Sequence, residues 1–432
     1  MIQIRRIDER DGNFHARLRQ LSSVNMQMDP ELTATVTSII NDIRERGDEA
    51  LVEYTNRFDN RKISIDDLAI PLESLETASR DIPVEMLESL QYAAGRIKSY
   101  AEKQKIESWS YTDETGILLG QQVTAVEKAG IYVPGGRATY PSSVLMNAIP
   151  ARVAGVDEII MAVPAPAGEL NPAVLAAAYI AGVDRVFSIG GAQAVAALAF
   201  GTETVPQVDK IVGPGNRFVA AAKRLVYGTV GIDMIAGPSE VLIVTDGSCD
   251  PDWIAMDMFA QAEHDEDAKA ILVGADASHL DEVMESIRKL LPEMERAEII
   301  RKSLENHGAL ILAAEPDSIA SIINRIAPEH LQLPIQNPES LLPQIRNAGA
   351  IFLGNYTAES LGDYCVGPNH VLPTARSARF SSPLGVYDFQ KRSSVIKCDK
   401  GSVATIAAAA SVLARGEGLT AHARSAEYRK KA

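Results

Sequence analysis

Ala327-Pro328-Glu329-His330 places a carboxylate beside an imidazole, directly after a proline. Both groups can transfer protons near neutral pH. Side chains of adjacent residues point to opposite faces of a strand and diverge by roughly 100° on a helix, so Glu329 and His330 are not expected to form one hydrogen-bonded relay. If both are functional, they serve two separate proton transfers. The alternative interpretation is a helix start, with the proline in the first turn and Glu329 at the positive end of the helix.

A second group of polar residues has the donor atoms of a metal site. Gln261 and His264 are three residues apart at the end of a predicted helix, so they share a face and could contact one metal ion. The alternative is a polar helix end. Asp363 and His370 lie in a turn-rich loop after a predicted strand, where a carboxylate and an imidazole suit a site. His422 follows near the C-terminus, in the segment Glu417-Gly418-Leu419-Thr420-Ala421-His422.

Two imidazoles, one carboxylate and one amide oxygen form a reasonable zinc set without thiolate, although an amide ligand is uncommon. These residues spread over about 160 positions of the chain, so their spacing alone is a weak indication. The three cysteines are widely spaced and contain no Cys-x-x-Cys, which indicates neither a disulfide framework nor a thiolate zinc site and fits a reducing cytoplasm.

The elements that must position these groups follow a repeated pattern. Four short apolar cores begin roughly every 25 residues, at Val156, Val183, Val208 and Ile232, and each leads into a Gly/Pro-rich loop. Alanine-rich helical stretches lie between them. A strand, a loop and a helix in repetition are typical of βαβ units in an open, doubly wound parallel sheet, where ligands bind at the carboxyl ends of the strands. No loop has the Gly-x-Gly-x-x-Gly pattern, so a dinucleotide site is expected from topology alone.

Further βα patterns predict a second α/β domain over about 240–380, joined by the early helices. The chain has 432 residues, 46% of them hydrophobic, which suffices for two domains with sizeable cores. A net charge of −15 argues against nucleic-acid or anionic-membrane partners. The charged N-terminus lacks a signal core, and the apolar runs are shorter than the about 20 residues of a membrane span.

Eight ordered stretches of the sequence carry a resemblance, and they are Ala129-Gly130-Ile131-Tyr132-Val133-Pro134-Gly135-Gly136, Gly190-Gly191-Ala192-Gln193-Ala194, Val212-Gly213-Pro214-Gly215-Asn216, Ala236-Gly237-Pro238-Ser239-Glu240, Ala260-Gln261-Ala262-Glu263-His264, Ala327-Pro328-Glu329-His330-Leu331, Asn369-His370-Val371-Leu372-Pro373-Thr374 and Glu417-Gly418-Leu419-Thr420-Ala421-His422. As a group, these motifs resemble those of the histidinol dehydrogenase family, from about residue 25 to residue 425.

The resemblance implies a cytoplasmic enzyme that oxidises L-histidinol to L-histidine with two NAD+ and one zinc ion, through an aldehyde that stays bound. It implies catalytic bases Glu329 and His330. The residues expected to bind ligands are, for zinc, Gln261, His264, Asp363 and His422; for NAD, Tyr132, Gln193 and Asn216; and for the substrate, Ser239, His330, His370 and Glu417 together with the four zinc ligands. Zinc has no redox chemistry, so its expected work is to orient the substrate.

The resemblance also implies an intertwined homodimer in which Glu417 and His422 act in the partner's site. The expected fold is two Rossmann-like open parallel-sheet domains with helical extensions at both ends. The expected ranges are residues 1–25 for an N-terminal helical extension, 26–125 plus 240–384 for the zinc and substrate domain, 126–239 for the NAD domain and 385–432 for the C-terminal helical extension.

Three alternatives stay open from the residues. A relative with the same cofactors could oxidise another small alcohol, a zinc hydrolase could use Glu329 as the base on a metal-bound water, and a scaffold protein would leave the polar motifs unexplained. Cys365, between Asp363 and His370, adds the option of a thiohemiacetal intermediate, although no nearby sequence feature activates the thiol.

Overall fold

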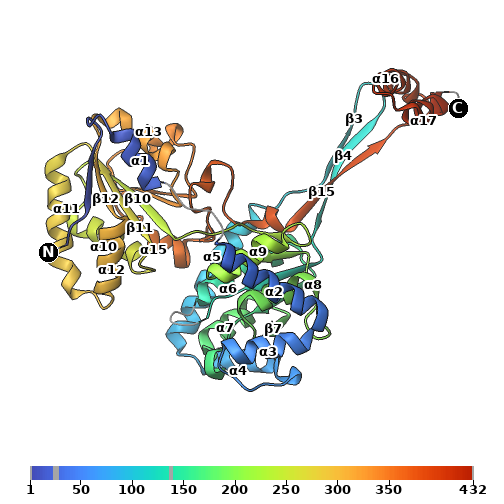
Figure 1. Cartoon of the computed structure of the whole chain (residues 1–432). Coiled ribbons are helices and arrows are strands. Elements are labelled where there is room, and N and C mark those ends of the chain that lie inside the picture. The colour runs from blue at the N-terminus through green and yellow to red at the C-terminus, as the bar shows by residue number, and fades with distance from the viewer. Residues whose placement is uncertain (1, 23–28, 136–139, 431–432) are drawn as a thin grey trace.

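Two α/β domains lie next to each other in the computed structural model, and an arm extends away from them (Figure 1). The structure describes residues 2–22, 29–135 and 140–430. We call the two central sheets sheet I and sheet II. Among the described residues, no helix combines the length and apolar character needed to cross a membrane.

Sheet I has six strands, in the order β2 (Ala69–Ile70), β7 (Arg185–Phe187), β6 (Glu158–Ala162), β5 (Lys128–Tyr132), β8 (Lys210–Val212) and β9 (Gly231–Ile232). The short edge strand β2 is antiparallel, and the other pairs are parallel. Counted from β5, the parallel strands have the order 3-2-1-4-5 of a doubly wound fold. The repeat of apolar cores therefore correctly predicts this sheet, with the switch in strand order between β5 and β8.

Eight helices belong to this domain, namely α2 (Pro30–Arg46), α3 (Asp48–Phe58), α4 (Leu72–Asp81), α5 (Val84–Glu102), α6 (Pro141–Ala154), α7 (Pro172–Ala181), α8 (Gly191–Phe200) and α9 (Arg217–Val226). Residues of α2 and α3 share a buried core with one face of sheet I, and residues of α4 and α5 with the other face. The sequence grouped 26–125 with 240–384, so the structure corrects that division. An apolar stripe shows that a helix face is buried, but it does not show which sheet covers it.

Sheet II is wholly parallel, in the order β1 (Arg5–Asp8), β12 (Ala309–Leu312), β11 (Lys269–Gly274), β10 (Glu240–Thr245), β13 (His330–Leu333) and β14 (Ala350–Leu353). Its order from β10 is again 3-2-1-4-5, with β1 added at the edge. All six residues of β10 are buried because cores cover both faces of the sheet. The accompanying helices are α1 (Phe14–Ser22), α10 (Pro251–Ala262), α11 (Ala277–Leu290), α12 (Ala297–His307), α13 (Ile319–Ile326), α14 (Pro338–Leu341) and α15 (Glu359–Leu361).

Both chain ends differ from the predicted helical extensions. The N-terminal segment begins with β1, which pairs with β12 and buries Ile7, before helix α1 follows; residues 23–25 lie outside the described part. A four-residue strand with three charged side chains gives too short an alternation to be recognised in the sequence. The C-terminal segment includes strand β15 (Gln390–Lys397), almost wholly exposed and polar, which pairs antiparallel with β4.

The arm is formed by β15, β4 (Leu118–Ala125) and β3 (Trp109–Thr112), and it carries α16 (Val403–Gly416) and α17 (Thr420–Lys430) at its tip. Figure 1 shows these two helices well away from both sheets. Strands β3 and β4, which precede sheet I in the chain, and strand β15, which follows sheet II, thus pair to form one projecting element.

Candidate active site between the two sheets

The Glu329–His330 pair lies at the amino end of β13, where the chain enters sheet II, and not at a helix start. The peptide groups of Glu240, the first residue of the neighbouring β10, hold both side chains. Its N–H donates to Glu329 Oε2 at 2.9 Å, and its carbonyl oxygen lies 3.2 Å from His330 Nδ1. A carbonyl only accepts, so Nδ1 carries a proton, and in the neutral form of the ring the lone pair lies on Nε2.

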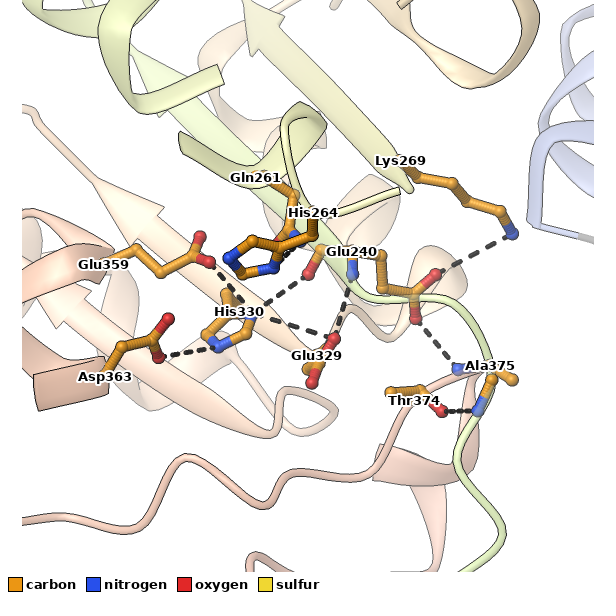
Figure 2. Close-up of polar contacts among 11 residues, drawn as sticks. Glu240, Gln261, His264, Lys269, Glu329, His330, Glu359, Asp363, Thr374 and Ala375 are labelled. Atoms are coloured by element: carbon orange, nitrogen blue, oxygen red, sulfur yellow. Dashed lines mark hydrogen bonds and ion pairs between the residues drawn. The ribbon is translucent and has the colours of Figure 1, made fainter. Parts of the chain in front are cut away.

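Carboxylates surround the His330 ring on several sides (Figure 2). Its Nδ1 lies 3.8 Å from Glu329 Oε2 and 3.5 Å from Glu359 Oε1, and its Nε2 lies 3.6 Å from Asp363 Oδ1. The 3.8 Å separation within the pair is too long for a hydrogen bond. The expectation that adjacent positions would not form one direct relay therefore agrees with the geometry.

Burial and charge shift the protonation of this cluster strongly. Burial raises the pKa of Glu329 to about 7, against a weaker opposing effect of His330. Burial alone would lower the pKa of His330, but Glu359 and then Glu329 outweigh it and raise this pKa to about 10. The Glu359 carboxyl, also buried, has its pKa raised to about 8. Glu329 can thus exchange a proton at neutral pH. The His330 ring, in contrast, is protonated at neutral pH as long as the surrounding carboxylates keep their charge.

The predicted metal ligands Gln261 and His264 lie at the C-terminal end of α10, above the His330 ring in Figure 2. Gln261 Nε2 is 3.4 Å from His264 Nδ1, while the fully buried Gln261 Oε1 has no hydrogen-bond partner. A buried amide oxygen without a partner costs free energy, which a cation could recover. His264 is exposed in the cavity, and partial desolvation lowers the pKa of its ring, so the ring is neutral and free to bind a metal at neutral pH.

Asp363 is the third predicted metal ligand in the body of the chain. It lies in the π-helical segment Gly362–Val366 after α15, and although burial opposes this, its contact with His330 lowers the pKa of its carboxyl. Among the described residues, His330, Glu359 and Asp363 also form a group whose ligand atoms lie within 4.8 Å of one another. This group shares only Asp363 with the predicted set. Because Nδ1 of His330 already contacts a backbone carbonyl, only its Nε2 could bind a cation in this group.

A cavity of about 480 Å³ joins these groups across the two domains. From sheet II it is lined by Ser239, His264, Glu329, His330 and Asp363. From sheet I it is lined by Pro214 and Gly215 of the loop after β8, and His370 adds its ring, which lies 3.2 Å from Ser143 Oγ. The structure therefore brings together the predicted substrate residues of sheet II at the amino ends of its strands.

Three of the predicted zinc and substrate residues do not line this cavity within one chain, namely the buried Gln261 and the residues Glu417 and His422. Glu417 and His422 are exposed on α16 and α17 or beside them, at the tip of the arm (Figure 1). Cys365 is half-buried and lines neither of the cavities described for this site. With the arm placed as in this structure, a site that uses Glu417 and His422 would receive them from another chain.

A second cavity of about 830 Å³ opens at the carboxyl ends of sheet I, the end expected from the topology. It contains the three predicted NAD residues, Tyr132, Gln193 and Asn216. The Tyr132 hydroxyl accepts a hydrogen bond from Gly191 N–H at 3.0 Å, and the Asn216 side chain caps α9. The buried Gln193 Oε1 has no partner. Helix N-termini and a free amide oxygen beside an apolar cavity suit a phosphate-bearing, aromatic ligand.

Sequence reasoning missed three residues at these sites. Glu359 is four positions before Asp363, a spacing that shares a helix face and was a usable signal. Glu240 is the last residue of the motif Ala236-Gly237-Pro238-Ser239-Glu240, but the sequence assigned it no role. Asp59, from the loop after α3, lines the second cavity and accepts from Ala165 N–H, and nothing in its sequence surroundings indicates this contact.

Comparison with known proteins identifies the family. The family model described as Histidinol dehydrogenase matches residues 23–430. The histidinol dehydrogenase of Pseudomonas aeruginosa is 63% identical over 427 residues, covering 99% of this chain and 97% of the relative. That of Methylococcus capsulatus is 61% identical over 429 residues, covering 99% and 98%.

A solved structure agrees with the sequence comparisons. The crystal structure of histidinol dehydrogenase from Elizabethkingia anophelis matches with a TM-score of 0.94 at 33% identity, over 100% of this chain and 99% of that one. The fold, the ordered motifs and the similarity over full length lead to one conclusion: this chain belongs to the histidinol dehydrogenase family.

Proposed function

We propose that this protein oxidises L-histidinol to L-histidine in two NAD-dependent steps, with the aldehyde kept at the site between them. The observation that carries the proposal is the loop Gly213–Asn216, which borders both cavities and so places a proton-transfer cluster next to a site fit for NAD. NAD+ bound there would accept the hydride of each oxidation.

The substrate end of the cavity suits a ligand with an amine and an imidazole. Asp363 and Glu329 supply carboxylates, and burial lowers the pKa of His370, so that its neutral ring can bind the substrate's imidazole by hydrogen bonds. We assign substrate contacts to Ser239, His330 and His370, with Glu417 contributed by a second chain. An acidic cavity also attracts a cationic substrate to a protein of net charge −15.

The two bases have different surroundings and are assigned different steps. With the charge of Asp363 neutralised, the unprotonated Nε2 of His330 would take the alcohol proton in the first oxidation. Glu329, with a pKa of about 7, takes a proton from the water that hydrates the aldehyde before the second oxidation. The Glu240 peptide holds both groups in place between the steps.

The donor set fits zinc, with Gln261, His264 and Asp363 from one chain and His422 from its partner. A zinc ion held there would orient the substrate's nitrogen atoms and, by neutralising Asp363, bring the pKa of His330 down toward the range of a base. The arm supports a homodimer, because it exposes large apolar side chains that a second chain could cover, namely Trp109, Ile396, Val412, Leu413 and Tyr428.

The test of the function is NADH formation from L-histidinol. The zinc-loaded protein should form two NADH for each histidinol consumed, with little free aldehyde, as followed by absorbance and by product analysis. A set of other small amino alcohols serves as the control for substrate choice. No activity at millimolar histidinol, or a single NADH with release of aldehyde, would contradict the proposal.

Metal analysis tests the ligand set. Asp363→Ala and His422→Ala should each lose bound zinc, because removing one of four ligands weakens the site by orders of magnitude. His15→Ala is the matched control, since His15 is exposed, contacts Arg325 at 2.9 Å and lines neither cavity. Elemental analysis of the purified proteins decides the matter, and a His422 variant with full zinc content would remove this residue from the set.

A further inference from the structure

The loop Gly213–Asn216 contributes adjacent residues to both cavities. Among the predicted motifs in the described part of the chain, no other does so. Pro214 and Gly215 line the catalytic cavity, and Asn216 lines the cofactor cavity. Its position therefore sets the distance between substrate and cofactor.

A buried ion pair holds the first residue of this loop. Lys223 of α9 and Asp233, just after β9, are in contact, with side chains only 5% and 1% exposed. Lys223 Nζ donates to the Gly213 carbonyl oxygen at 2.9 Å, and Gly213 N–H donates to Asp233 Oδ2 at 2.8 Å. Both polar backbone groups of Gly213 are thus bonded to the same pair of charges.

The backbone at Gly213 also packs closely against the backbone of β5. Its φ of +109° is open to glycine, and a Cβ atom there would lie 2.1 Å from the Tyr132 carbonyl oxygen. Tyr132 lines the cofactor cavity. The pair therefore fixes the loop against β5 with little room to move.

Stability alone does not account for two buried charges at this point. A buried ion pair can often be replaced by apolar side chains at no cost in stability, whereas removal of one partner leaves an uncompensated charge. The two charges contribute geometric specificity, because charge-assisted hydrogen bonds hold the Gly213 backbone in a defined position.

We propose that Lys223 and Asp233 are positioning residues, which hold the loop so that substrate and NAD meet in reactive geometry. The inference rests on the proposed function, because it assigns the two cavities to substrate and cofactor. A displacement of about 1 Å can reduce turnover by about a hundredfold. Neither side chain lines the catalytic or the cofactor cavity, so both act through Gly213.

The experiment compares Lys223→Met with the double variant Lys223→Met/Asp233→Asn in the full-length, zinc-loaded enzyme. Lys223→Met should lose thermal stability, raise KM for NAD and lower kcat by about ten- to a hundredfold. The double variant removes the unpaired charge, so it should regain stability while its kcat and KM stay impaired. Assays are run at a temperature at which circular dichroism shows the variants folded.

Arg152→Met is the matched control. Arg152 pairs with Asp184 at 2.6 Å in the same domain, but at the amino end of sheet I, before β7. It should affect stability and leave kcat and both KM values unchanged.

The outcomes separate the two proposals. A wild-type enzyme without NAD-dependent histidinol oxidation refutes the proposed function and with it this inference. An active wild type with a double variant that regains kcat together with stability shows a merely structural pair and overturns the positioning role. If Lys223→Met does not fold, the double variant alone decides.

Discussion

Glu329→Gln is expected to reduce oxidation of supplied histidinaldehyde by about a hundred- to ten-thousandfold, and oxidation of histidinol to aldehyde much less. The amide keeps the shape of the side chain and can still accept from Glu240 N–H, so the loss reports the base and not the fold. His330→Asn should show the reverse, with the larger loss in the alcohol step. The two half-reactions are measured separately by single-turnover formation of NADH.

The pH profile gives the same prediction a second readout. Because burial raises the pKa of Glu329 to about 7, the carboxyl is protonated below that pH and cannot act as a base. The kcat/KM for aldehyde oxidation should therefore fall about tenfold for each pH unit below about 7 in the wild type. In Glu329→Gln the low residual rate should lack this dependence.

Asp257→Asn controls for the loss of a buried carboxyl as such. Asp257 on α10 accepts from Gln332 at 3.1 Å, its burial raises its pKa to about 6, and it does not line the catalytic cavity. Its variant should leave the ratio of the two half-reactions unchanged. Equal losses in both half-reactions for Glu329→Gln and His330→Asn would contradict the division of roles.

The sequence predicts the strands better than the assembly of the strands. The apolar cores near Val183 and Val208 and the run from Glu240 are strands β7, β8 and β10, because a strand buried on both faces reads as a continuous apolar run. The placement of 26–125 fails for a different reason. Amphipathic helices encode a buried face, and the choice between two similar sheets depends on contacts distant in sequence.

The site illustrates the same limit. The carboxyl-end rule predicts the cofactor cavity of sheet I, but the catalytic pair lies at the amino end of sheet II. The candidate active site thus lies where opposite ends of two similar sheets face each other across the loop at Pro214 and Gly215. Only the resemblance between sequences, and no local pattern, grouped Gln261 with Asp363, because their relative placement depends on how α10 and α15 pack against each other.

The exposed position of His422 leads to an expected result with a large effect. Two inactive chains, Glu329→Gln and His422→Ala, should recover activity when they are combined in one dimer. If each arm completes the partner's site, one site of the mixed dimer receives both defects and the other receives neither. Random pairing of equal amounts should then restore about a quarter of the sites. Distinct affinity tags allow the mixed dimers to be purified and assayed with histidinol and NAD.

Combination of Glu329→Gln with Asp363→Ala is the matched control for this result. Both residues lie in the body of the same chain, Glu329 before β13 and Asp363 after α15, so every site of the mixed dimer keeps one defect and no activity should return. Recovery in the first pair but not in the second can arise only if His422 and Glu329 of different chains share a site. Two results would contradict this prediction. The tagged mixed dimers of Glu329→Gln and His422→Ala could stay inactive, or the protein could remain monomeric at assay concentration. Either result would require the arm to fold back onto its own chain.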